Sequence, residues 1–137
     1  MLQCDFSYMI SPDMFRQFVA PELRDSCQKL KNAFYHLDGP GEIPHLDILL
    51  EIPELKGIQW IPGAGAPEID QWPDLLRKIR EAGKLVQVYS TPAQADNIIK
   101  QLVTGEWVLF ALSGLRTTHE ALEYLCQYND RLQLFDE

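Results

Sequence analysis

Hydrophobic and polar positions follow two periods along this chain, and turns rich in glycine and proline separate them. Apolar residues that recur every three or four positions predict helices, whereas short runs rich in β-branched and aromatic residues predict strands. Residues 1–9 look like the tail end of a strand or a strand-to-helix loop, and the segment after Tyr128 is expected to be irregular or one short closing element. Strands are predicted within 32–41 and at 57–61, 84–91 and 106–114, and helices at 11–30, 43–52, 69–82, 92–103 and 117–128.

Several helix boundaries carry their own signals. Ser11-Pro12-Asp13 supplies an N-cap, a proline at the first helical position and an acid in the first turn. Pro21 lies within the same helix and is expected to kink or split it, because proline removes a backbone hydrogen bond. Gly83 is the predicted end of the helix at 69–82, and Thr117 or Thr118 is the predicted cap of the last helix.

Strands that alternate with helices favour an α/β fold. Right-handed crossovers between such units produce a parallel sheet. Four βα units preceded by a strand end are compatible with a small doubly wound sheet or with half of a (β/α)8 barrel of the TIM type. A whole barrel needs about 250 residues, and this chain has 137. We therefore expect a single α/β domain over residues 1–137.

Composition narrows the class of protein. The net charge of −8 argues against a non-specific nucleic-acid binder, because phosphate contacts need clustered lysine and arginine. No run approaches the ~18 apolar residues of a membrane span, and no basic stretch followed by an apolar one marks a signal peptide. Cys4, Cys27 and Cys126 form no CxxC pair, so we expect free thiols and a cytoplasmic protein.

The stretch NAFYHLDGPG, residues 32–41, is the strongest candidate for a site. Side chains two apart on a strand point the same way, so His36 and Asp38 share one face where Gly39-Pro40-Gly41 ends the strand. An imidazole beside a carboxylate can bind a metal, hold a proton or orient a polar substrate. The structural alternative is a buried histidine satisfied by Asp38, or an aspartate that only caps the turn.

Other candidates are single residues near strand ends. The glycine-rich loop 62–68 is more typical of a permissive turn than of an anion site. His45 and His119 are expected to face solvent, and no nucleophilic triad is recognisable. The residues that remain as candidates for pocket walls or ligand contacts are Cys4, Asp5, Gln59 or Trp60, Gln87 or Tyr89, and Ser113 with Arg116. The register that decides between the paired alternatives is not given by the pattern.

The run CDFSYMISPDMFRQFVAPEL, followed by FYHLDGPG, resembles the uroporphyrinogen decarboxylase-like superfamily. Members carry an SP-x-x-F-x-x-F-x-x-P helix, matched from Ser11 to Pro21, and then a strand ending in His-x-Cys-Gly, matched at 36–39. The superfamily includes methyltransferases that move methyl groups between corrinoid proteins and thiols. The resemblance is specific over residues 4–41, and it implies the C-terminal half of that barrel.

Two departures change what the resemblance implies. Thiol-methylating members bind zinc through the histidine and cysteine of His-x-Cys and a second cysteine near the last strand. Here Asp38 replaces the first cysteine and Ser113 stands on the last predicted strand, so no zinc held by two thiolates is expected. A harder set of His36, Asp38 and one further ligand stays open. The residues that catalyse decarboxylation in the family lie in the N-terminal half, so that activity is not implied.

The resemblance therefore leads to a functional hypothesis of corrinoid-linked methyl transfer, with a corrinoid protein as methyl donor and a small-molecule substrate. His36 and Asp38 would contact the substrate or a metal. The alternative is a non-catalytic α/β module that binds a ligand or partner. A half-barrel exposes strand edges and one sheet face, so we expect a homodimer or a separately encoded N-terminal half. Several of Ile58, Ile61, Val86, Val88, Leu109 and Leu112 are expected on that face.

Overall fold

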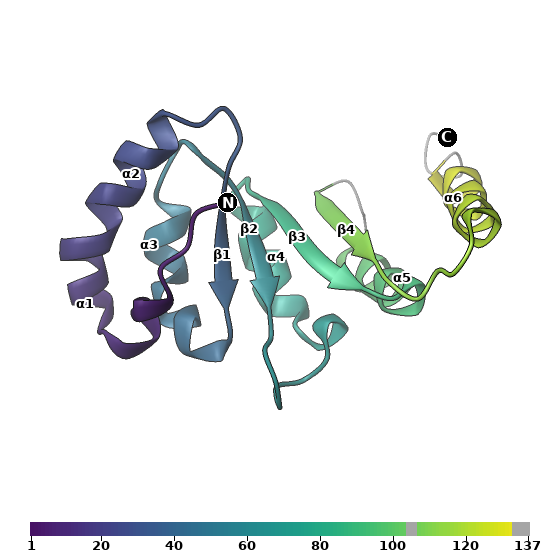
Figure 1. Cartoon of the computed structure of the whole chain (residues 1–137), viewed down its shortest axis with the longest axis horizontal. Coiled ribbons are helices and arrows are strands. Elements are labelled where there is room, and N and C mark those ends of the chain that lie inside the picture. The colour runs from purple at the N-terminus through teal and green to yellow at the C-terminus, as the bar shows by residue number, and fades with distance from the viewer. Residues whose placement is uncertain (104–106, 133–137) are drawn as a thin grey trace.

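A computed structural model describes residues 1–103 and 107–132 and shows an α/β fold built on a four-stranded parallel sheet (Figure 1). The strand order is sequential, β1-β2-β3-β4. The strands are β1 (Ala33–Asp38), β2 (Leu55–Ile61), β3 (Leu85–Ser90) and β4 (Val108–Leu112). The α-helices are α1 (Pro12–Met14), α2 (Ala20–Gln28), α3 (Leu46–Leu50), α4 (Pro73–Glu81), α5 (Pro92–Leu102) and α6 (Thr118–Leu132).

All the predicted strands are present, whereas two of the predicted helices are divided into shorter elements. The predicted helix at 43–52 divides into a 3-10 segment (Pro40–His45) and α3, and the one at 69–82 divides into a 3-10 turn (Ile69–Gln71) and α4, which starts at Pro73. Glu106, predicted to begin the last strand, lies outside the described residues, as does the tail 133–137. The last helix extends past Tyr128 to Leu132, and Thr117 caps it by accepting a hydrogen bond from the Glu120 amide at 3.1 Å.

Pro21 does not split the first helix. Residues 12–28 stay helical without a break, because Phe15–Val19 form a π-helical segment directly before the proline. The Ala20 amide donates to the Phe15 carbonyl, five residues back. This wider turn absorbs the missing proline donor, as π-bulges in helices commonly do. Ser11 caps the start as predicted, accepting from the Met14 amide at 3.2 Å.

The N-terminal residues continue the sheet for one step. Leu2 bridges Tyr35 of β1 in parallel, donating to the Phe34 carbonyl at 2.7 Å and accepting from the His36 amide at 2.8 Å. A 3-10 segment (Asp5–Met9) follows. Residues 1–9 thus combine a single bridge to β1 at Leu2 with a loop and a 3-10 segment, so a strand end is present only at Leu2.

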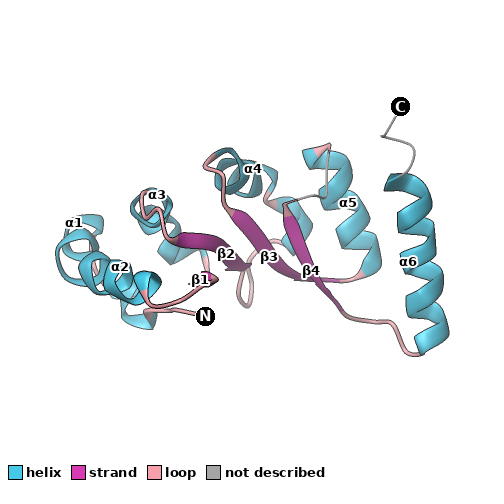
Figure 2. Ribbon diagram, turned by 90° about the horizontal axis from the view of Figure 1, so that it is seen from above, coloured by secondary structure: helices cyan, strands magenta, loops and turns pink. Residues whose placement is uncertain are grey.

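In the described residues the strand order is sequential, whereas in a doubly wound sheet the order reverses and helices cover both faces. Figure 2 shows α3, α4 and α5 along one face of the sheet, with α1 and α2 beyond the β1 edge and α6 beyond β4. Within residues 1–103 and 107–132, no helix lies on the opposite face. We call these the covered face and the open face.

Side chains alternate between the two faces along every strand. Fully buried apolar side chains of the covered face include Tyr35, Leu37, Ile58, Trp60, Val86 and Val88. Several of six apolar residues were expected on the exposed face. Ile61 and Leu109 lie there, whereas Ile58, Val86, Val88 and Leu112 have the opposite parity. The sequence did not decide between them, because alternation fixes the pairing of faces but not which set the helices cover.

In the part of the chain that the structure describes, no helix is long and apolar enough to cross a membrane.

Candidate functional site

His36 and Asp38 lie on the open face at the carboxyl end of β1. The chain turns there at Gly39, whose φ of +83° is a conformation that residues with a Cβ rarely adopt, and whose amide donates to the Ile61 carbonyl at 2.8 Å. His36 Nε2 is 3.9 Å from Asp38 Oδ2. The predicted shared face is confirmed, and His36 is not packed among the aliphatic side chains beneath the helices.

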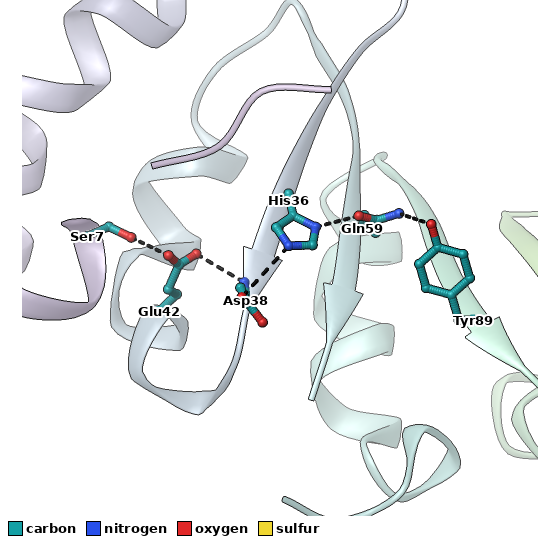
Figure 3. A network of polar contacts seen from close by, with 6 residues as sticks. All are labelled: Ser7, His36, Asp38, Glu42, Gln59 and Tyr89. Atoms are coloured by element: carbon teal, nitrogen blue, oxygen red, sulfur yellow. Dashed lines mark hydrogen bonds and ion pairs between the residues drawn. The ribbon is translucent and has the colours of Figure 1, made fainter. Parts of the chain in front are cut away.

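The register of the sheet extends this pair into a row of polar side chains. His36 pairs with Gln59 of β2, and Gln59 pairs with Gln87 of β3. His36 Nδ1 is hydrogen-bonded to Gln59 Oε1, and Gln59 Nε2 donates to the Tyr89 hydroxyl at 3.5 Å (Figure 3). Gln59 Nε2 also donates to Gln87 Oε1 at 3.2 Å. We call His36, Gln59, Gln87 and Tyr89 the polar row.

The register also decides the paired alternatives left by the sequence. Gln59 faces the polar row, whereas Trp60 is fully buried on the covered face against Trp72, with ring centroids 5.0 Å apart. Gln87 and Tyr89 have the same parity on β3, so both face the row. Tyr89 is 58% exposed and Gln59 only 5%, so the row runs from a buried amide to an accessible phenol.

A second polar cluster holds the turn after β1. Glu42 is 2% exposed, and its carboxylate accepts from Ser7 Oγ at 2.6 Å and from the Asp38 amide at 3.1 Å. Burial raises the pKa of Glu42 above its usual range, and the hydrogen bonds from Ser7 and Asp38 oppose that rise. Figure 3 shows this cluster on the other side of Asp38 from the polar row. Asp38 therefore has Glu42 at its backbone and His36 at its side chain.

A cleft of about 490 Å³ opens beside this turn. Its walls come from the 3-10 segment 5–9, the turn after β1 and the loop after β2. The lining residues are Asp5, Tyr8, Asp38, Gly39, Pro40, Glu42, Pro62, Gly63, Ala64, Gly65 and Ala66. Three of these are acids and none is a lysine or arginine, so the cleft is suited to hydrogen-bond donors and cations rather than to anions.

Gly41 allows Tyr8 to form a wall of this cleft. A Cβ at Gly41 would lie 2.2 Å from the Tyr8 ring, a distance that real Cβ atoms do not show. The glycine in the Gly-Pro-Gly turn therefore has a packing role as well as a role in ending the strand.

The structure brings some of the predicted site residues together and separates others. His36, Gln59 and Tyr89 belong to one hydrogen-bonded row, Asp38 lies 3.9 Å from His36, and Asp5 lines the same cleft as Asp38. Cys4 is partly buried against the core and does not line the cleft.

Ser113 is also separate from the cleft. Its hydroxyl donates to the Ser90 carbonyl at 3.4 Å, at the ends of β3 and β4, while the Arg116 amide donates to Glu120 at 2.7 Å. These contacts give Ser113 and the Arg116 backbone local roles at the ends of strands and helices.

The expectation that His45 faces solvent is wrong. It is 1% exposed, stacks on Phe15 with ring centroids 4.5 Å apart, and has Nε2 2.8 Å from the Ser7 carbonyl oxygen. The prediction of a solvent-facing helix position failed because residues 40–45 form a 3-10 segment whose inner side differs from that of an α-helix. His119 is exposed on α6, as expected.

The residues present do not fit a thiolate zinc site. Cys4 is partly buried near the sheet edge, Cys27 is buried in α2 and Cys126 is exposed on α6. Across the described ranges 1–103 and 107–132, no three histidine, cysteine or acidic side chains converge closely enough to hold a metal ion. Among these residues a third ligand for His36 and Asp38 is therefore also absent.

Sequence reasoning missed Ser7, Tyr8 and Glu42. Glu42 was hidden because a glutamate after Gly-Pro-Gly is typical of an exposed turn, and its burial depends on Ser7, 35 positions away in sequence. For Ser7 and Tyr8 the resemblance over residues 4–41 offered the one available signal, since both lie within it, whereas Glu42 lies just beyond it.

Comparison with protein-family models, with curated proteins and with solved structures finds no match to this chain.

Proposed function

We propose that this chain is the C-terminal half of a (β/α)8 barrel of the uroporphyrinogen decarboxylase-like kind and that it serves corrinoid-linked methyl transfer. The sequential parallel order and the helices on a single face support the half-barrel, because each strand of a barrel lies beside the next one in sequence. The motifs at Ser11–Pro21 and at 36–39 support the family.

The observation that carries the proposal is the position of the polar row. In (β/α)8 enzymes the chemistry takes place at the carboxyl ends of the strands, inside the ring of helices. His36, Asp38, Gln59 and Tyr89 lie on the open face, which corresponds to the inside of such a ring, and Asp38 also lines the cleft at the carboxyl edge. An apolar structural face would have no use for this set of hydrogen-bonding groups.

In this proposal the methyl donor is a corrinoid protein that acts as a substrate of the open face. The chain's own residues bind and orient a small polar acceptor, such as a thiol. Asp5, Asp38 and Tyr8 line the acceptor cleft, and His36 contacts the acceptor from the neighbouring strand position. A second copy of the chain, or a separately encoded N-terminal half, completes the enclosure.

The test is an assay of methyl transfer from methylcobalamin to a small thiol, followed through the absorbance of the corrinoid. We expect transfer above the uncatalysed rate with the purified chain, and its loss in His36→Ala. His119→Ala is the matched control, because His119 is exposed on α6 and pairs with Glu123 at 3.3 Å. Both variants should remain folded.

A second candidate is a non-catalytic ligand-binding module. The cleft favours it, because a ligand can bind there although no set of metal ligands lies among the described residues. Absence of any His36-dependent transfer, together with binding of small cations or amines at the cleft, would contradict the methyl-transfer proposal and support this module instead.

A further inference from the structure

Gln59 is the residue of the polar row that is hydrogen-bonded to both neighbouring strands. Its contacts determine which ring nitrogen of His36 carries the hydrogen. Its side chain comes from the middle of β2 and is almost completely removed from solvent. The neighbours within hydrogen-bonding reach of its amide are His36 on β1 and two residues of β3, Gln87 and Tyr89. A buried amide without water must satisfy its donors through such neighbours.

The number of donors and acceptors favours one orientation of this amide. The NH2 group has two hydrogens to donate, and the side facing β3 offers two acceptors, Gln87 Oε1 at 3.2 Å and the Tyr89 hydroxyl at 3.5 Å. The side facing β1 offers one ring nitrogen, His36 Nδ1. The opposite orientation would leave one buried N–H without an acceptor, which costs about 1–3 kcal/mol.

The oxygen of Gln59 therefore faces His36, and an amide oxygen can only accept. His36 Nδ1 must then carry a hydrogen. In a neutral imidazole the other ring nitrogen, Nε2, is left with its lone pair. Nε2 points to the Asp38 side of the ring, 3.9 Å from Asp38 Oδ2, and Asp38 lines the cleft (Figure 3).

We propose that Gln59 is a positioning residue that holds His36 as the Nδ1–H tautomer, so that Nε2 receives a proton from the ligand. The role in chemistry rests on the proposed function. When a thiol acceptor binds there, its S–H bond would break, the proton would go to Nε2, and the electron pair would stay on sulfur as a thiolate. The thiolate would attack the methyl group of the corrinoid substrate, so that the S–CH3 bond forms as the Co–CH3 bond breaks and its electron pair leaves with the cobalt. Asp38 then faces the imidazolium and stabilises its charge.

The experiment is a long-range 1H–15N correlation spectrum of the uniformly 15N-labelled chain, recorded at a pH where imidazoles are neutral. His36 is assigned by comparison with His45 and His119 variants. We expect the wild-type pattern of an Nδ1–H tautomer. A wild-type spectrum with the hydrogen of His36 on Nε2 overturns the proposal without any substitution.

Three variants sharpen the test. Gln59→Leu removes the acceptor and should lose the Nδ1–H preference, whereas Gln59→Glu keeps an acceptor toward Nδ1 and should retain it. Gln28→Leu is the matched control, because Gln28 is exposed on α2 and lies outside the polar row. Retention of the Nδ1–H tautomer in folded Gln59→Leu would contradict the proposal. Should Gln59→Leu fail to fold, the wild-type and Gln59→Glu spectra still decide.

The proposal about the tautomer and the proposal about the activity can be contradicted independently of each other. An Nδ1–H tautomer in a chain that transfers no methyl group would contradict the proposed function alone. Methyl transfer that depends on His36, in a chain whose His36 carries its hydrogen on Nε2, would contradict the role of Gln59 alone.

Discussion

The two faces of the sheet are built from alternate residues of the same strands, yet they differ in kind. The covered face is apolar and buried under α3, α4 and α5, with Ile58, Trp60 and Val88 fully removed from solvent. The open face carries His36, Gln59 and Gln87, which bond to one another across three strands. Residues one position apart therefore differ in character: the covered face packs the apolar core, and the open face carries the residues of the candidate site.

The largest effect that follows from this comparison concerns assembly. In the described part of the chain β4 pairs only with β3, and Leu109 on its open face is 48% exposed. Burial of several hundred Å² of apolar surface, at about 25 cal/mol per Å², would stabilise association by several kcal/mol. We expect sedimentation equilibrium at micromolar concentration to give a mass of at least twice 15.7 kDa.

Leu109→Glu should shift this equilibrium toward single chains, because it places a charge in the buried contact. Gln71→Glu is the control, since Gln71 is exposed in the 3-10 turn before α4. A wild-type species of 15.7 kDa alone would contradict the assembly and leave the open face to solvent.

The second largest effect is the difference in stability lost when either of two isoleucines on β2 is replaced. Ile58 is fully buried on the covered face, and Ile61 is half-buried on the open face. Ile58→Ala should lower the free energy of unfolding by about 2–5 kcal/mol, because it removes buried methyl groups and leaves a cavity. Ile61→Ala should cost about 1 kcal/mol or less. Urea denaturation measures both, and equal losses would mean that the open face is packed as tightly as the covered one.

The third effect is the difference in stability lost when either of two histidines is replaced. His45→Ala should cost about 2–4 kcal/mol, because it removes a buried ring that stacks on Phe15 and contacts the Ser7 carbonyl oxygen. His36→Ala should cost about 1 kcal/mol, because the His36 side chain is partly exposed and its removal lets water reach the Gln59 oxygen. Thermal unfolding separates them, and a larger loss for His36→Ala than for His45→Ala would favour a structural role for His36.

The sequence predicted the order of elements because each has local causes. The apolar periodicity, the Ser11 cap and the Gly-Pro-Gly turn act within a few residues of the structure they produce. The pairing of His36 with Asp38 was predictable for the same reason, as two positions on one strand.

The rest of the site depends on contacts between distant parts of the chain. Gln59 joins His36 only through the register of β1 with β2, and Glu42 meets Ser7 across 35 positions. The same limit explains why His45 was expected in solvent: its neighbours Phe15 and Ser7 come from segments that lie far away in sequence. Local pattern cannot report these pairings, since register and burial are set by the assembled sheet.

The smallest effect is a change in the pH dependence of stability, and Glu42 at the border between the two faces produces it. Burial holds the pKa of Glu42 above its value in the unfolded chain, so the folded state binds more protons between the two values. Its contribution to stability is therefore fully present below the unfolded value, about 4.3, and is lost as pH rises through the folded value.

Glu42→Gln removes this titration, so the difference between wild-type and variant unfolding free energies should change with pH in that window and be constant well above it. The variant also loses one of the two carboxylate oxygens that accept from Ser7 and the Asp38 amide, which lowers its stability. Glu22→Gln, at an exposed position of α2, is the control. Urea denaturation at a series of pH values from 4 to 8 gives the three curves. A Glu42→Gln curve parallel to the wild-type curve throughout would mean that the pKa of Glu42 does not change on folding. It would also mean that water reaches the Glu42 carboxylate in the turn after β1.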